Sequence, residues 1–291
     1  MNMDLICEQF GITRQAHYQK MKREKQQQQD EEIIMEMVRL IRRKHPRMGT
    51  RKLLFKMKPM LAVEGLMIGR DRIFSLLRDQ NMLVYPKKAY RRTTIPGYWR
   101  TPNLLPGLTI SDPNQVWVCD ITYLEVEVDR FAYLFLLMDL FSRFIVGWHV
   151  ATSLMATGAV ACLTMALKSF PERKNNCIHH SDHGVQYTAH SYMQMLLQEG
   201  IRPSMGAVGN CYDNIFAERV IGTLKHEYAL DARFADHHQV QSAVDQAIRY
   251  YNTDRPHLSL NMAVPHDVYF GLYHDVPSLL IPDRELLSTK N

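Results

Sequence analysis

The sequence predicts an α/β protein in which a mixed β-sheet flanked by helices follows a small region made only of helices. Three observations predict this arrangement. Helical periodicity dominates up to about residue 82, three β-rich segments follow one another between residues 115 and 153, and helices then alternate with short strands up to residue 252. Strands that follow one another directly favour antiparallel pairing, and strands reached through a helix favour parallel pairing.

The composition is that of a globular protein. The 291 residues are 46% hydrophobic and 22% charged, which argues against wholesale disorder. No run approaches 18 consecutive apolar residues, and the N-terminus lacks the layout of a secretory signal. The five cysteines are odd in number and have no CxxC spacing, so we expect reduced thiols and neither a disulfide frame nor a zinc site. We expect a cytoplasmic protein with no membrane partner.

Charge is divided unevenly between the two parts of the chain. Residues 1–110 hold 22 Lys and Arg against 10 Asp and Glu, and residues 111–291 hold the remaining 13 against 20. A basic first part favours contact with nucleic acid, because phosphates attract such surfaces. A solvated surface that is merely basic is the structural alternative.

The first 86 residues are predicted to be helical. Residues 1–26 read as short helices broken at Gly11, with Thr13 as an N-cap, and a run of glutamines follows at 26–29. Over 27–86, helices separated by short glycine-containing turns outline a helix-turn-helix-like DNA-binding region. A basic, proline-containing linker is expected over 87–111.

A catalytic core is expected over 112–272 and a C-terminal tail over 273–291. The expected strands and helices, in order, are the strands 115–128, 130–141 and 143–153, a helix at about 156–169, a strand at 175–182, a helix at 189–200, a strand at 201–206, and the helices 213–230 and 237–252. RNase H-like domains have this order of elements, so we predict an RNase H-like core.

Asp120 interrupts an apolar strand face. Period-two alternation places Val116, Val118, Asp120, Thr122 and Leu124 on one side of the strand. A carboxylate on such a face is costly unless it is paired or binds a cation. Asp120 is therefore a candidate metal ligand, and a purely structural Asp near a strand end is the alternative.

Asp182 follows another short apolar strand and precedes Gly184, a common place for a functional carboxylate. The histidines nearby (His179, His180 and His183) raise the alternative of a histidine metal site. We do not favour it, because adjacent histidines in a strand point to opposite faces.

Glu218 lies on a predicted helix whose apolar stripe is formed by Phe216, Val220 and Leu224. Glu218 points away from this stripe. The same exposed side carries Gly222, a gap through which another molecule can approach, and the ammonium group of Lys225. An ordinary solvated helix face is the structural alternative.

The three acids together match the chemistry of divalent cations. Mg²⁺ prefers hard oxygen ligands and keeps waters and substrate phosphate oxygens in its shell. Two such ions about 4 Å apart can activate the attacking oxygen and stabilise the leaving oxygen of an in-line displacement.

Five sequence stretches resemble those of the insertion-sequence-3 family of transposases, whose cores are related to retroviral integrases. They are NQVWVCDITYL, LMDLFSRFIVGW, HHSDHGVQY, GNCYDNIFAERVIGTLKHE and YYNTDRPHLSL. The 35 residues between Asp182 and Glu218 match the family's D,D-35-E signature, and HPRMGTRKLL is similar to the helix-turn-helix-like region upstream of its core.

The resemblance implies a DDE enzyme, a polynucleotidyl transferase that cleaves the 3′ ends of an insertion element and transfers the strands. Asp120, Asp182 and Glu218 would be the catalytic acids, holding two Mg²⁺ or Mn²⁺ ions, and Lys225 would contact the DNA end. His183 stands where the family commonly has Arg. The remaining candidate DNA contacts are Gly222, His183, Asn214, Arg51 and Lys52.

The implied partners are double-stranded DNA at element ends and target, and further copies of the chain on that DNA. The upstream-frame protein of the family is a further partner, as a fusion or separately, and association with the nucleoid is expected. Two other functions remain open: an inactive DNA-binding remnant or regulator, and an RNase H-like nuclease.

Overall fold

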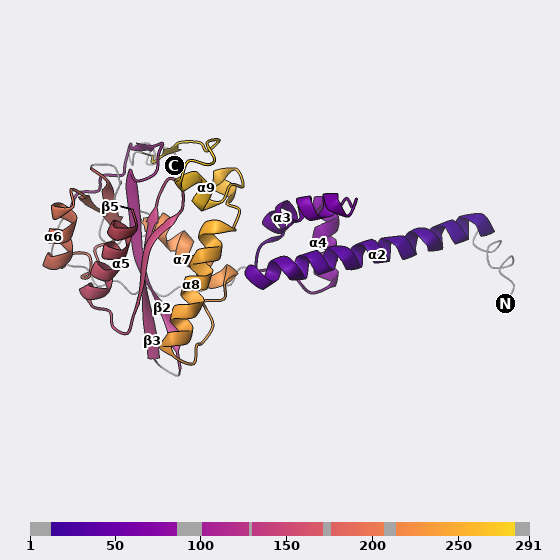
Figure 1. Cartoon of the computed structure of the whole chain (residues 1–291), viewed down its shortest axis with the longest axis horizontal. Helices are drawn as coiled ribbons and strands as arrows, with labels where there is room; N and C mark the ends of the chain where they lie inside the picture. The colour runs from indigo at the N-terminus through magenta and orange to yellow at the C-terminus, as the bar shows by residue number, and fades with distance from the viewer. Residues whose placement is uncertain (1–12, 86–100, 128–129, 171–175, 207–213, 283–291) are drawn as a thin grey trace, which may run out of the picture. The chain divides into compact units, whose positions relative to one another are not determined.

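The structure is a computed structural model that describes residues 13–85, 101–127, 130–170, 176–206 and 214–282 (Figure 1). The chain divides into two compact units, Met1–Tyr85 and Pro86–Asn291. The expected helix break at Gly11 and most of the expected linker lie outside the described residues.

The described part of the first unit, residues 13–85, contains three helices: α2 (Arg14–Lys44), α3 (Thr50–Val63) and α4 (Arg70–Asp79). Its core contains Val38, Met48, Leu53, Met57, Ile73 and Leu77. This confirms the helical character expected for the region, and the helix-turn-helix-like DNA-binding role stays a prediction.

The helix α2 corrects the expected boundary at residue 26, because it runs without a break through the glutamine run. Thr13 is its N-cap, as predicted, and accepts a hydrogen bond from Ala16 N at 3.1 Å. Gln26 and Gln27 donate to acids one turn later, at 2.9 and 2.8 Å. Glutamine has good intrinsic helix propensity, and such pairs add to it.

The second unit contains strands and helices in the order predicted. They are β1 (Thr109–Ile110), β2 (Val116–Val126), β3 (Arg130–Asp139), β4 (Ile145–Ala151), α5 (Ala156–Ser169), β5 (Ile178–Ser181), α6 (His190–Gln198), β6 (Arg202–Met205), α7 (Ile215–Glu227), α8 (His237–Thr253), a 3₁₀ turn (Leu258–Leu260), α9 (Pro265–Tyr269) and β7 (Leu279–Leu280).

Five of these strands form a mixed sheet in the order β4-β3-β2-β5-β6. The strands β2, β3 and β4 pair antiparallel, whereas β5 pairs in parallel with β2 and with β6. This topology confirms the RNase H-like fold predicted from the order of elements.

Helices cover both faces of the sheet. Figure 1 shows α5 and α6 on one side and α7 and α8 on the other. The alternation along β2 produces both cores, because Val116, Val118 and Leu124 pack toward α7 and α8 while Trp117 and Cys119 pack toward α5 and α6. The side-chain pattern of β2 therefore agrees with the period-two prediction.

The expected linker and tail also contribute to the second unit. The strand β1, from the expected linker, pairs antiparallel with β7, from the expected C-terminal tail. The core unit therefore extends beyond the range 112–272. In the part of the chain that the structure describes, no helix has both the length and the apolar character needed to cross a membrane.

Candidate active site

The strands β2 and β5 bring Asp120 and Asp182 to the same level of the sheet. The two strands pair in parallel, with Val118 opposite His180. Asp120 lies two residues after Val118, and Asp182 lies two residues after His180. Because side chains alternate along a strand, each aspartate lies on the same face of the sheet as the paired residue before it. Neighbouring strands are about 5 Å apart. The two carboxylates therefore lie side by side, where β5 ends.

Backbone N–H groups orient both carboxylates. Ile121 N donates to Asp120 Oδ1 at 2.8 Å, and Gly184 N donates to Asp182 Oδ1 at 3.0 Å. No hydrogen bond to either Oδ2 is present among the described residues. A Cβ at position 184 would lie 3.0 Å from Asp182 Oδ1, so glycine permits this close approach. Each carboxylate is therefore oriented through its Oδ1 oxygen.

The helix α7 presents Glu218 from its first turn. Ala217, Val220 and Leu224 are buried against the sheet, and Glu218 is exposed on the other side of the helix. Val220 and Leu224 are buried as the expected stripe requires, whereas Phe216 is half-buried and Ala217 is buried in its place. The stripe decides the direction in which Glu218 points.

Asn214, the N-cap residue of α7, has a different role from the DNA contact expected from the sequence. Its Nδ2 donates to Cys119 O at 3.0 Å, and the residue is only 7% exposed. This hydrogen bond ties the start of α7 to the β2 residue that precedes Asp120. Asn214 thus joins the helix that carries Glu218 to the strand that carries Asp120.

The four charged side chains of the site affect one another. Burial, and then the carboxylates of Asp182 and Glu218, raise the pKa of Asp120 to about 8, against the lowering effect of the Ile121 N–H and Lys225. Burial and Asp182 also raise the pKa of Glu218. Burial lowers the pKa of Lys225, against Asp120 and Asp231. The strand β2, the end of β5 and the helix α7 therefore meet in one acidic site, and the ammonium group of Lys225 acts on Asp120 there.

The donor set fits a magnesium ion. Among the described residues, no three His, Cys, Asp or Glu side chains lie close enough together to hold a metal ion. Mg²⁺, however, is commonly held by one or two carboxylates together with waters and substrate phosphates. Asp120 and Asp182 supply two such carboxylates, and the mutual repulsion that raises the pKa of Asp120 is the kind that a bound cation relieves.

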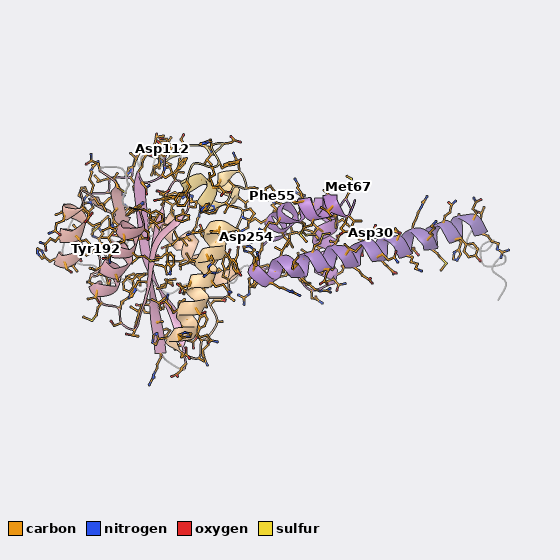
Figure 2. The ribbon with its side chains drawn as sticks, viewed as in Figure 1. Asp30, Phe55, Met67, Asp112, Tyr192 and Asp254 are labelled. Atoms are coloured by element: carbon orange, nitrogen blue, oxygen red, sulfur yellow. The ribbon has the colours of Figure 1, made fainter. Side chains whose placement is uncertain are left out.

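The histidines beside Asp182 have structural partners. His179 Nε2 lies 2.8 Å from the hydroxyl of Tyr192, a residue of α6 that is labelled in Figure 2. His180 Nδ1 lies 2.9 Å from Ser204 Oγ on β6. Both histidines are buried, and burial lowers the pKa of His179 to about 3. These contacts support the structural interpretation of the histidines.

The other DNA-contact candidates differ in exposure. On α7, Gly222 is half-buried, and a Cβ built there meets no atom within 4 Å. Lys225 and His183 are half-buried. In the first unit, Arg51 is exposed, whereas Lys52 is only 8% exposed. Because Lys52 is buried, we expect Arg51, and not Lys52, to contact DNA.

Asp139 is a buried acid that sequence reasoning missed. Its carboxylate accepts hydrogen bonds from Asn114 N at 2.7 Å and Ser142 N at 2.8 Å. Burial raises the pKa of Asp139 to about 6, against those hydrogen bonds. The serine three residues after the aspartate is the signal that indicates this turn. Asp139 organises the turn between β3 and β4 rather than the acidic site.

The chain is similar to known integrases and proteins of insertion sequences. The chain matches two models described as "Integrase core domain", over residues 111–211 and 199–265. It is 32% identical over 266 residues to the "Insertion element IS600 uncharacterized 31 kDa protein" of Shigella sonnei, covering 89% of this chain and 96% of that protein. It is 36% identical over 148 residues to the transposase InsF for insertion sequence IS3A of Escherichia coli, covering 50% of this chain and 51% of that one.

Among solved structures, the chain is similar to the integrase catalytic core domain of HTLV-2 in complex with magnesium. The identity is 15%, the TM-score is 0.43, and the match covers 57% of this chain and 99% of that one.

Proposed function

The chain belongs to the insertion-sequence-3 family of transposases, and from this premise we propose that it cleaves the 3′ ends of an insertion element and joins them to other DNA. Asp120, Asp182 and Glu218 are the proposed catalytic acids. One observation supports the proposal: Asp120 and Asp182 each lie two residues after paired positions of the parallel strands β2 and β5, and both carboxylates interact electrostatically with Glu218 of α7.

Asp120 and Asp182 would hold Mg²⁺ or Mn²⁺ through the oxygens that accept no hydrogen bond, with Glu218 as the third acid. Two bound ions supply Lewis-acid activation of the attacking oxygen and stabilisation of the leaving oxygen. In the protein itself, the N–H groups of Ile121 and Gly184 fix the orientation of the strand carboxylates.

Lys225 is the proposed contact to the DNA end. It lies on α7 seven residues after Glu218, about two helical turns along the same side. Its charge acts on Asp120 in the protein without DNA. An ammonium group beside the acids offsets part of the repulsion that a polyanionic DNA end meets there. Arg51 is the proposed contact from the first unit, and we propose that several copies of the chain assemble on the DNA.

The proposal is tested by strand transfer on a labelled duplex that ends in the terminal repeat of the flanking element. The wild-type chain and Glu218→Gln are compared with Mg²⁺, with Ca²⁺ and with EDTA. Glu127→Gln is the matched control, because Glu127 is exposed and lies just after the end of β2, seven residues from Asp120.

Joined product that requires both Mg²⁺ and Glu218, and that survives Glu127→Gln, supports the transposase. Specific binding without joining supports the inactive regulator, and cleavage without joining supports the nuclease. If the chain alone neither binds nor joins, the fusion with the upstream-frame protein is compared in the same assay.

A further inference from the structure

The position of α7 decides whether the site is complete, since this helix carries both Glu218 and Lys225. Asn214 ties its first turn to β2. Phe216, in the same turn, packs under the guanidinium of Arg143, which lies 4.9 Å from the ring centroid. Both contacts hold the N-terminal end of the helix, and a further polar contact lies at the last turn, next to Lys225.

The anchor at the last turn is a buried two-point ion pair. Arg255 Nε donates to Glu227 Oε2 at 2.8 Å, and Arg255 Nη2 donates to Glu227 Oε1 at 2.9 Å. The side chains of Arg255 and Glu227 are only 6% and 17% exposed. The guanidinium also lies 5.4 Å from the ring centroid of Tyr251. Two parallel hydrogen bonds between planar groups fix orientation as well as distance.

The segment that carries Arg255 is itself held firmly. Asp254, labelled in Figure 2, is the C-cap of α8 and immediately precedes Arg255. Asn252 binds the edge strand β4 through both groups of its amide, accepting from Ile145 N at 2.9 Å and donating to Ile145 O at 3.0 Å. A continuous set of contacts therefore runs from β4, through the end of α8, to Glu227 on α7.

The burial of this pair points to a role in geometry. A buried ion pair gives little net stability, because desolvation offsets most of the attraction between the charges. Arginine differs from lysine here, since only its planar fork reaches both carboxylate oxygens at once. Glu227 is two residues after Lys225, about 3 Å along the helix axis.

We propose that Arg255 is a positioning residue: through its buried pair with Glu227 it fixes the last turn of α7 and so directs Lys225 toward the DNA end. The inference rests on the proposed function for the role of Lys225, and on contacts within the chain for the anchoring of α7.

Hydrogen exchange of the protein without metal or DNA tests the anchoring. Arg255→Lys keeps the charge and loses the fork, so the amides in the last turn of α7 should exchange about tenfold faster. The amides of α5, across the sheet, should be unchanged, whereas general loosening would speed both. Arg249→Lys, an exposed arginine on α8, is the matched control, and Glu227→Gln tests the pair from its other side. Unchanged exchange in α7 for both Arg255→Lys and Glu227→Gln would overturn the anchoring.

Affinity for the terminal-repeat duplex, measured by fluorescence anisotropy in Ca²⁺, tests the direction of Lys225. Arg255→Lys should weaken binding about tenfold in the wild-type background and have no further effect in Lys225→Ala, since coupled residues give non-additive effects. Additive losses would refute the positioning role, even if exchange in α7 rises. If Lys225→Ala binds as the wild type does, the proposed DNA contact of Lys225 is wrong, and so is the claim that Arg255 directs Lys225 toward DNA. The hydrogen-exchange result still decides whether Arg255 anchors α7.

Discussion

Adding one methyl group at Gly222, by the substitution Gly222→Ala, tests two properties of α7 separately: the stability of the helix and the approach of DNA to it. Gly222 lies within α7, between Glu218 and Lys225, and no atom of the described residues lies within 4 Å of a Cβ built there. Alanine therefore needs no repacking. Glycine inside a helix is about 0.5–1 kcal/mol less stable than alanine. We expect Gly222→Ala to raise the melting temperature by about 1–4 °C.

The same methyl group should impair the reaction. It fills the gap between Glu218 and Lys225 on the helix side that we propose meets DNA. Forcing a methyl group into a close contact costs about 1–3 kcal/mol, so we expect strand transfer to fall by about tenfold while Mn²⁺ affinity is unchanged. Thermal unfolding, calorimetric Mn²⁺ titration and the strand-transfer assay are run on the same preparations.

Gly158→Ala is the matched control. A Cβ at position 158 would lie 2.3 Å from the ring of Phe135, so this substitution should lower the melting temperature and shift activity only through stability. Higher stability with undiminished joining by Gly222→Ala would refute the close approach of DNA to α7. A lower melting temperature for Gly222→Ala would refute the open space described at this position.

Three further results are expected. Asp182→Asn should abolish joining and retain DNA binding, and joined product from this variant would remove Asp182 from the catalytic acids. The raised pKa of Asp120, about 8, means that cation binding displaces a proton, so calorimetric Mn²⁺ affinity should increase from about pH 6 through pH 8 and level off above about pH 9. The pKa of Asp120 in the folded protein lies above its value in the unfolded chain. Its contribution to the free energy of unfolding is therefore present below about pH 4 and is lost as the pH rises through about 8. Asp120→Asn should therefore unfold at higher urea than the metal-free wild type at pH 9, and a lower midpoint would contradict the assigned burial. Asn252→Ala leaves Ile145 N and O without their amide partner and should cost about 2–4 kcal/mol in urea unfolding, whereas a loss below about 1 kcal/mol would show that water replaces the amide.

The features that the sequence predicted correctly depend on local periodicity. Alternation along β2 placed Asp120 on the face of Val118, and the apolar stripe of α7 placed Glu218 on the opposite side of the helix, because a side chain's direction follows from the repeat of its own element. The order of strands and helices indicated the mixed sheet for a similar reason, since short connections limit how consecutive elements can pair.

Contacts between distant segments were decided by the tertiary structure alone. Asn214 and Lys52 were candidate DNA contacts in the sequence, but only the fold shows that Asn214 donates to Cys119 O and that Lys52 is largely buried. The pairing of Arg255 with Glu227 has no local signal either. A sequence does not distinguish a charged or amide side chain that contacts solvent from one that contacts DNA or another helix. Its partner is determined by the three-dimensional packing and not by its neighbours along the chain.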